Sequence, residues 1–228
     1  MKMSEENLNV KEEALIKIYN EWEIGKAYEQ NPNFSPMFRM GYPTDFLENE
    51  KPLIMYVGQE CLRCNEEKSQ VWVRGYQEEE IHKNKDHRPF WIFYLDLYKM
   101  GYNVIWNNLN KFHLANTTYL DEDSAVILNK SYGTDNLSII QREIIETQPT
   151  AIVFAIGNKQ RYIKSLAASF SKSEDVLSPY RPTKEQPINE ISAVLGLKNK
   201  KVFWCYHPAY LNRSKNYEKA IQFIKEMV

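Results

Sequence analysis

Four short, almost continuous apolar runs constrain this 228-residue chain more than any other feature. They lie at residues 53–57, 103–106, 151–156 and 202–205, at intervals of roughly fifty residues. Strands of a parallel sheet that are buried on both faces have this composition, whereas strands with one solvated face alternate apolar and polar residues. The runs therefore predict a buried, mostly parallel sheet of four strands.

Helical patterns occupy the intervals between these runs. Pro89 can open a helix that Gly101 ends, because Pro suits the first helical turn and Gly suits the position after the last. Ser138 and Gln141 have the spacing of a capping box, and Pro149 marks the end of the helix that they begin. Further helices are expected at residues 10–28 and after residue 214.

The alternation of strands and helices predicts an α/β fold, namely a three-layer α/β/α sandwich around a central, mostly parallel four-stranded sheet. The length suits a single domain over residues 1–228, in which residues 1–45 form an N-terminal helical extension. The segment 171–187, which is rich in Ser, Pro and Lys, is expected to be a long loop.

The charge and the cysteine content limit the classes of protein to which this chain can belong. The formal net charge of −1 gives no general attraction to polyanions, so any polyanion site must be local, as in the basic stretch 158–172. No apolar run approaches the roughly 18 residues of a membrane span, and the N-terminus is too charged for a signal peptide. Three cysteines fit reduced thiols. We therefore expect a cytoplasmic protein.

Polar residues follow each apolar run, at the edge where parallel sheets bind ligands. They are Gly58-Gln59-Glu60, Asn107-Asn108, Gly157-Asn158 and His207-Pro208. A carboxylate can activate water, an amide can read a base edge, and an imidazole can stabilise a developing anion. Turns after strands also favour Gly and Asn for structural reasons alone, so the set carries more weight than any member.

The segments "VGQE", "VIWNNL", "VFAIGN" and "HPAYLNR", in this order, resemble the motifs of the uracil-DNA glycosylase superfamily over roughly residues 50–228. The resemblance implies a three-layer α/β/α fold and hydrolysis of the N-glycosidic bond of uracil or a related damaged base in DNA. It implies no metal and no cofactor. The partner would be single- or double-stranded DNA, and the enzyme would act in DNA repair.

The same resemblance assigns roles to individual residues. Glu60 stands where the family has the Asp that activates water, and His207 would bond the carbonyl oxygen that gains charge. Base-binding residues would be Gly58, Gln59, Asn107, Asn108 and Trp72, with Asn108 favoured over Asn107 for the base edge. Contacts to the nucleic acid would come from Gly157, Asn158, Lys159, Tyr210, Leu211 and Arg213, with Leu211 in the position of the family's wedge leucine.

A second pattern lies directly after Glu60. Cys61 and Cys64, followed by His82 and His87, have the outline of a zinc site, although the central gap is longer than in the usual zinc finger. The alternative that we favour makes residues 61–77 the mouth of the site, with Trp72 as a stacking surface.

Two further hypotheses remain open from the sequence. One is a protein of the same fold that binds a nucleotide or nucleic acid without catalysis. The other is a zinc-containing domain of unrelated function.

Overall fold

The computed structural model describes residues 5–43, 47, 50–60, 81, 83, 88–114 and 119–228. The strands in these ranges are β1 (Leu53–Gly58), β2 (Asn103–Asn108), β3 (Ala151–Phe154), β4 (Ile188–Glu190) and β5 (Lys201–Cys205). The helices are α1 (Glu5–Glu21), α2 (Glu23–Glu29), α5 (Pro89–Lys99), α6 (Glu122–Asn129), α7 (Ile139–Thr147), α8 (Gln160–Ser169), α9 (Glu174–Leu177), η2 (Ser178–Tyr180), α10 (Ser192–Leu195), α11 (Pro208–Arg213) and α12 (Tyr217–Met227).

The strands form one sheet in the order β2-β1-β3-β5-β4, and every pair is parallel except β4 with β5. The predicted α/β class and the mostly parallel sheet are confirmed, but the described sheet has five strands and the expected number of four is wrong. The extra strand, β4, is only three residues long and pairs antiparallel at the edge of the sheet. A segment of three residues gives no apolar run, so the sequence did not reveal it.

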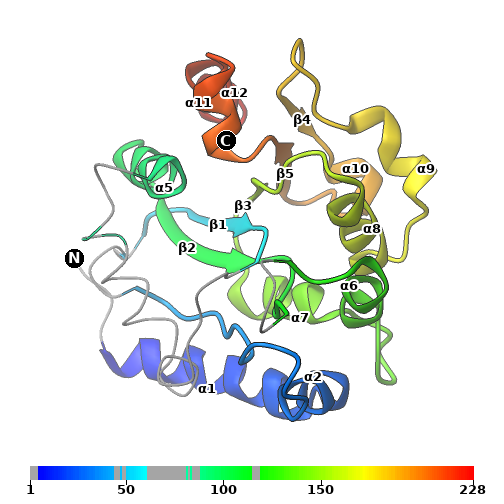
Figure 1. Ribbon diagram of the computed structural model, residues 1–228. Coiled ribbons are helices and arrows are strands. Elements are labelled where there is room, and N and C mark those ends of the chain that lie inside the picture. Colours follow the sequence, from blue (N-terminus) through cyan, green and yellow to red (C-terminus); the bar gives the residue numbers. More distant parts are fainter. Residues whose placement is uncertain are drawn as a thin grey trace.

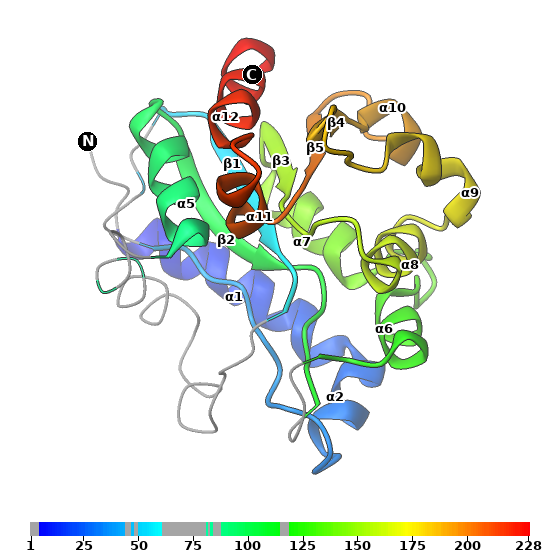
Figure 2. The same cartoon turned by 45° about the horizontal axis from the view of Figure 1, so that its top comes forward.

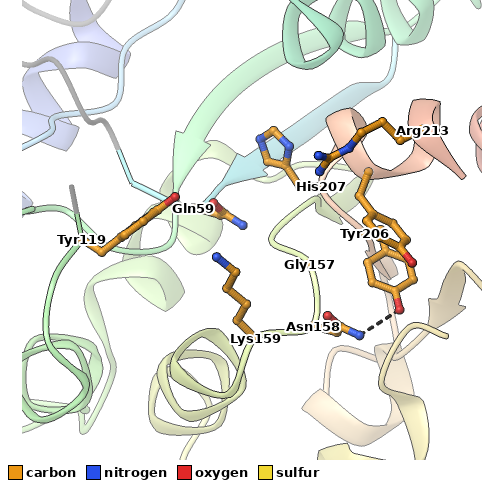
Figure 3. Close-up of a pocket in the computed structure, with 9 residues that line it drawn as sticks. Gln59, Tyr119, Gly157, Asn158, Lys159, Tyr206, His207 and Arg213 are labelled. Atoms are coloured by element: carbon orange, nitrogen blue, oxygen red, sulfur yellow. Dashed lines mark hydrogen bonds between the residues drawn. The ribbon is translucent and has the colours of Figure 1, made fainter. Parts of the chain in front are cut away.

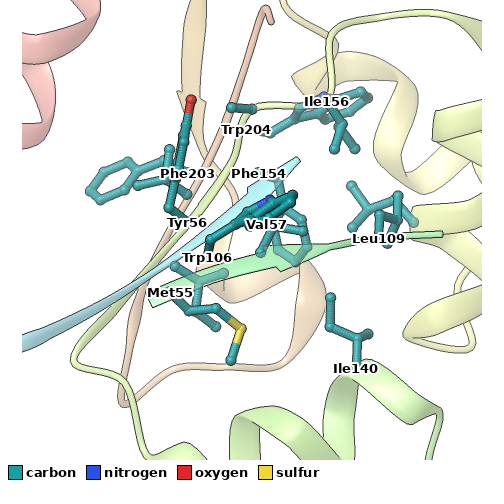
Figure 4. Packing of buried hydrophobic residues seen from close by; sticks show 14 of the residues in the cluster. Met55, Tyr56, Val57, Trp106, Leu109, Ile140, Phe154, Ile156, Phe203 and Trp204 are labelled. Carbon is teal, nitrogen blue, oxygen red and sulfur yellow. The ribbon is translucent and has the colours of Figure 1, made fainter. Parts of the chain in front are cut away.

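Helices lie on both sides of the sheet (Figure 1). Helices α1 and α7 cover one side, and α5, α11 and α12 cover the other, as the turned view also shows (Figure 2). Side chains of β1, β2, β3 and β5 pack together at the centre with Ile140 of α7 (Figure 4). No described helix combines the length and the apolar character that crossing a membrane requires.

Two of the expected helix boundaries are confirmed. Pro89 occupies the first turn of α5, and Ser138 caps α7 in a capping box. The Ser138 hydroxyl accepts from the Gln141 amide at 3.2 Å, and the Ser138 amide donates to the Gln141 side chain at 2.9 Å. The segment expected as one long loop contains two short helices, α9 and η2.

The expected N-terminal helix is divided in two at Trp22, whose backbone has φ −83° and ψ 84° and so leaves the helical region. The Trp22 side chain is fully buried against Gly25, where an added Cβ would lie 2.2 Å from the indole ring. Only glycine allows this approach. The break therefore lets the indole enter the core between α1 and α2.

A buried polar cluster ties α1 to the sheet. Tyr19 donates its hydroxyl proton to Glu143 of α7, and Lys111 forms an ion pair with Glu143 at 2.7 Å. Lys111 also donates to Asn107 at the end of β2, and Asn107 donates to Glu143 at 2.9 Å. All four residues are at most 2% exposed. Their polar atoms satisfy one another, which buried charges require.

Candidate functional site

A pocket of about 540 Å³ lies at the carboxyl edge of the parallel strands (Figure 3). Ligand pockets in proteins commonly have volumes of roughly 300–1,000 Å³. The loops after β1, β3 and β5 supply most of its wall. The lining residues are Gln59, Tyr119, Gly157, Asn158, Lys159, Tyr206, His207, Tyr210 and Arg213.

The parallel register explains why residues far apart in sequence meet here. Gly58 pairs with Asn108, so the ends of β1 and β2 are level, and Gly157 follows β3 with a left-handed φ of +77°. A Cβ added to Gly157 would lie 3.6 Å from the Gln59 side chain and 3.7 Å from the His207 amide. Seven of the predicted site residues thus line one pocket, namely Gln59, Gly157, Asn158, Lys159, His207, Tyr210 and Arg213.

Phe90, at the start of α5, contacts both Gly58 at the end of β1 and His207 after β5. Its ring lies against Gly58, where an added Cβ would be 3.0 Å from the ring, and it stacks on the His207 imidazole with centroids 6.0 Å apart. The Asn108 side-chain oxygen would be 2.7 Å from the same added Cβ. Gly58, Phe90, Asn108 and His207 therefore form one continuous group beside the pocket.

The side chain of Asn108 has a defined orientation. Its Oδ1 accepts a hydrogen bond from the Trp106 indole at 3.1 Å, and an indole N–H can only donate. The Nδ2 group consequently points elsewhere, and it is buried without a partner in the described part of the chain. A buried donor without a partner costs free energy, so this group suits a carbonyl oxygen supplied by a ligand.

His207 is a neutral hydrogen-bond donor. Its Nδ1 accepts from the Ala209 amide at 3.3 Å, so the ring proton of the neutral form sits on Nε2. Burial, together with the nearby charges of Arg213 and Lys159, lowers the pKa of His207 to about 4. The imidazole is thus uncharged at neutral pH and offers an Nε2–H group to a ligand.

Glu60 follows Gln59 in the chain but is not among the lining residues. It is 8% exposed, and its two oxygens accept from the Asn110 side chain at 2.9 Å and the Leu120 amide at 3.3 Å. Burial raises the pKa of this carboxyl above its usual range, and the two hydrogen bonds and the charge of Arg161 oppose that rise. The carboxylate is held in place within the protein interior.

The pocket is electropositive and aromatic. Lys159 and Arg213 are exposed at its rim, and no Asp or Glu is among the described residues that line it. The charged groups of Lys159 and Arg161 lie 5.2 Å and 3.9 Å from the centre of the Tyr119 ring. Such an arrangement favours an anionic ligand with planar groups.

Four residues of the site went unnoticed in the sequence: Phe90, Asn110, Tyr119 and Tyr206. The Tyr206 ring packs against Tyr210 with centroids 4.2 Å apart and planes inclined at 35°, and its hydroxyl accepts from Asn158 at 2.8 Å. Tyr206 lies between the last apolar run and His207, and this place at the end of a strand could have identified it as a site residue. Phe90 follows Pro89 in the predicted helix, and nothing in the pattern distinguishes it from core residues.

Two predicted site residues lie away from the pocket. Asn107 belongs to the buried cluster with Lys111 and Glu143, which engages both ends of its amide. Leu211 is fully buried in α11, so it is not displayed as a wedge at the surface. Its placement follows from helical periodicity, because α11 directs one face into the core and Leu211 lies on that face.

The predictions for Trp72, Cys61, Cys64, His82 and His87 concern residues outside the described ranges. Within those ranges, no three His, Cys, Asp or Glu side chains are grouped closely enough to hold a metal ion. Cys205 is a buried free thiol in β5.

No protein-family model matches the chain, and a search of curated proteins finds no significant match.

Proposed function

We propose that the protein is a hydrolase of the uracil-DNA glycosylase type, with the corresponding three-layer α/β/α sandwich, and that it releases uracil or a related damaged base from DNA. One observation carries the proposal. A neutral His207 with its ring proton on Nε2 lies in one group with Gly58, Phe90 and Asn108, beside an electropositive pocket at the strand ends.

The chemistry requires stabilisation of the departing base. When the C1′–N bond breaks, the bonding electrons stay with the base and negative charge develops on a carbonyl oxygen. A preorganised donor aimed at that oxygen lowers the barrier, and a neutral imidazole donates without a prior change of charge. Nε2–H of His207 supplies this donor. The buried Nδ2 of Asn108 donates to a base carbonyl and selects the base that has left the stack.

Glu60 completes the reaction by accepting a proton from water. The water oxygen forms a bond to C1′ as the C1′–N bond breaks, and one water proton passes to Glu60. The base leaves as an anion that takes up a proton from solvent, and Glu60 returns its proton to solvent, so that one water molecule is consumed in total. Each carboxylate oxygen accepts one hydrogen bond from the protein and has a second lone pair for water. The raised pKa makes the carboxylate a stronger base than an exposed one.

The test is base release from an oligonucleotide that contains uracil, followed by alkali, which cleaves the strand at the abasic site. Single- and double-stranded substrates and other deaminated or methylated bases are assayed in parallel. Purified protein should release at least one of these bases at a rate that depends on enzyme concentration. The absence of release from every substrate would contradict the catalytic proposal.

Variants assign the activity to the site. Glu60→Gln and His207→Ala should each lower the rate by roughly 100-fold or more while the protein stays folded. Glu13→Gln is the matched control, because Glu13 is an exposed glutamate on α1. If Glu13→Gln lowered the rate as much as Glu60→Gln does, the assignment of Glu60 would be wrong.

A second candidate function is binding of a nucleotide or nucleic acid without hydrolysis. It is favoured by the burial of Glu60, which is not among the lining residues and has both oxygens hydrogen-bonded to the protein. Tight, salt-dependent binding without release of any base would support this function over catalysis.

A further inference from the structure

Two cations approach the pocket from different elements. Lys159 precedes α8 and Arg213 ends α11, and both are exposed. Figure 3 shows them entering the cavity from opposite sides, with His207 near Arg213. Both charges act on His207, because each contributes to lowering its pKa. A nucleotide bound at His207 would therefore have one cation on each side.

The pocket also presents more aromatic surface than a single base needs. The rings of Tyr206 and Tyr210 pack together with centroids 4.2 Å apart and planes inclined at 35°, and Asn158 donates a hydrogen bond to the Tyr206 hydroxyl. Tyr119 lies across the cavity from Tyr206 (Figure 3). Tyr210 is half-buried, so part of its ring is accessible beside the cavity. Aromatic rings of this kind bind unpaired bases by stacking.

We propose that the pocket binds a continuous single DNA strand, in which Lys159 and Arg213 hold the phosphates that flank the target nucleotide and Tyr210 stacks on a neighbouring base. This inference rests on the proposed function and specifies its substrate. It adds Tyr206 and Tyr210 as the platform and assigns the strand, rather than the duplex, as the form that is recognised.

The two cations argue against a free nucleotide. A mononucleotide carries its phosphate on one side of the sugar, so a base and sugar placed between Lys159 and Arg213 leave one of the two cations without a phosphate. A strand carries a phosphate on each side of every internal nucleotide. The volume of about 540 Å³ exceeds what one planar base fills and is within the range that holds larger ligands.

The structure of α11 argues against a duplex. An enzyme that extracts a base from a duplex must offset the lost stacking and pairing, and apolar wedge residues do this in proteins that distort DNA. Leu211 is fully buried, and the exposed residues of α11 are the polar Asn212 and Arg213. A single strand requires no wedge, because its bases are already unpaired.

Binding is measured by fluorescence anisotropy with a labelled DNA strand of about ten nucleotides, a length within known site sizes for single-strand binding. The same sequence as a duplex and a mononucleotide competitor are the comparisons. The strand should bind at least tenfold more tightly than either. Equal affinity for the duplex, or competition by the mononucleotide at the same concentration as by the unlabelled strand, would overturn the inference.

Variants locate the contacts. Tyr210→Ala should weaken strand binding about tenfold and Tyr210→Phe should preserve it, since stacking needs the ring and not the hydroxyl. Tyr180→Ala, at an exposed tyrosine of η2, is the matched control. If Tyr210→Ala left the affinity unchanged, the platform would be refuted.

Salt dependence identifies the phosphate contacts. Lys159→Gln and Arg213→Gln should each reduce the slope of log affinity against log salt by about 0.7, the value for one contact on a single strand. Lys198→Gln, at an exposed lysine between α10 and β5, should leave the slope unchanged. Unchanged slopes in both Lys159→Gln and Arg213→Gln would overturn the assignment of the cations.

The two proposals fail in different ways. Base release from duplex substrates alone, with weak binding of single strands, would sustain the glycosylase and overturn the single-strand inference. Tight binding of single strands that depends on Tyr210, without release of any base, would sustain the strand site and contradict the glycosylase.

Discussion

Asn110 donates a hydrogen bond from Nδ2 to Oε2 of Glu60 at 2.9 Å. The same amide accepts at Oδ1 from Asn129 at 2.8 Å, and Asn129 accepts in turn from the Ser169 hydroxyl at 3.1 Å. All three donors are at most 1% exposed. The carboxylate is therefore oriented by a buried chain of hydrogen bonds that extends across α6 to the end of α8.

Asn110→Ala should shift the pH dependence of base release. Removing this donor destabilises the ionised carboxylate, so the pKa of Glu60, already raised by burial, should rise further. Because Glu60 must be ionised to accept a proton, the acidic limb of kcat/KM should move to higher pH. Ser169→Ala is the control, since it breaks the chain two bonds away from Glu60. Equal shifts in both variants would show that stability, and not the carboxylate, governs the limb.

His207 should remain neutral to about pH 5. Its pKa of about 4 in the folded protein is below the usual 6.5, so folding favours the neutral ring. The associated stability is complete above pH 6.5 and declines as the pH falls toward 4. Nitrogen NMR of the ring should show a proton on Nε2 and none on Nδ1 at pH 7. Arg213→Gln should raise the pKa. A measured pKa near 6.5 in the unmodified protein would contradict the described environment.

Gly58→Ala should impair the site by displacing Asn108. The added Cβ would lie 2.7 Å from Asn108 Oδ1 and 3.0 Å from the Phe90 ring, so one of them must move. Displacements of about 1 Å in an active site can lower rates roughly 100-fold. The matched comparison is Gly58→Ala in the Asn108→Ala background, where little further loss is expected because the displaced group is already absent. Additive losses in the double variant would rule out displacement of Asn108 as the cause.

Much of the fold could be predicted because buried parallel strands leave a strong local signal. The four runs at residues 53–57, 103–106, 151–156 and 202–205 coincide with β1, β2, β3 and β5. The helix boundaries at Pro89 and Ser138 followed from local chemistry. Strand β4 is stabilised only by pairing with β5, and no local pattern records such a tertiary contact.

The site could be predicted in position but not in detail. Gln59, Gly157 and His207 follow the ends of parallel strands, so the backbone topology alone places them at one edge of the sheet. Residues that look alike in the sequence can still differ in the partners of their side chains. Asn107 and Asn108 are adjacent, and strand alternation directs them to opposite faces, one toward Glu143 and the other toward Gly58. Only the three-dimensional structure shows which of them has an unused donor.

Lys111→Met should destabilise the protein by about 3–5 kcal/mol, because it leaves Glu143 buried without its cation. Replacing both charges, in Lys111→Met with Glu143→Leu, should recover only the part of the loss that comes from the unpaired carboxylate, because the buried donors of Tyr19 and Asn107 then lose their acceptor. Urea denaturation gives the free energies of unfolding. The control is Lys164→Met, which breaks the partly exposed ion pair with Glu122 and should change stability far less. A loss for Lys111→Met no larger than that for Lys164→Met would show that the buried cluster does not hold α1 and α7 against the sheet.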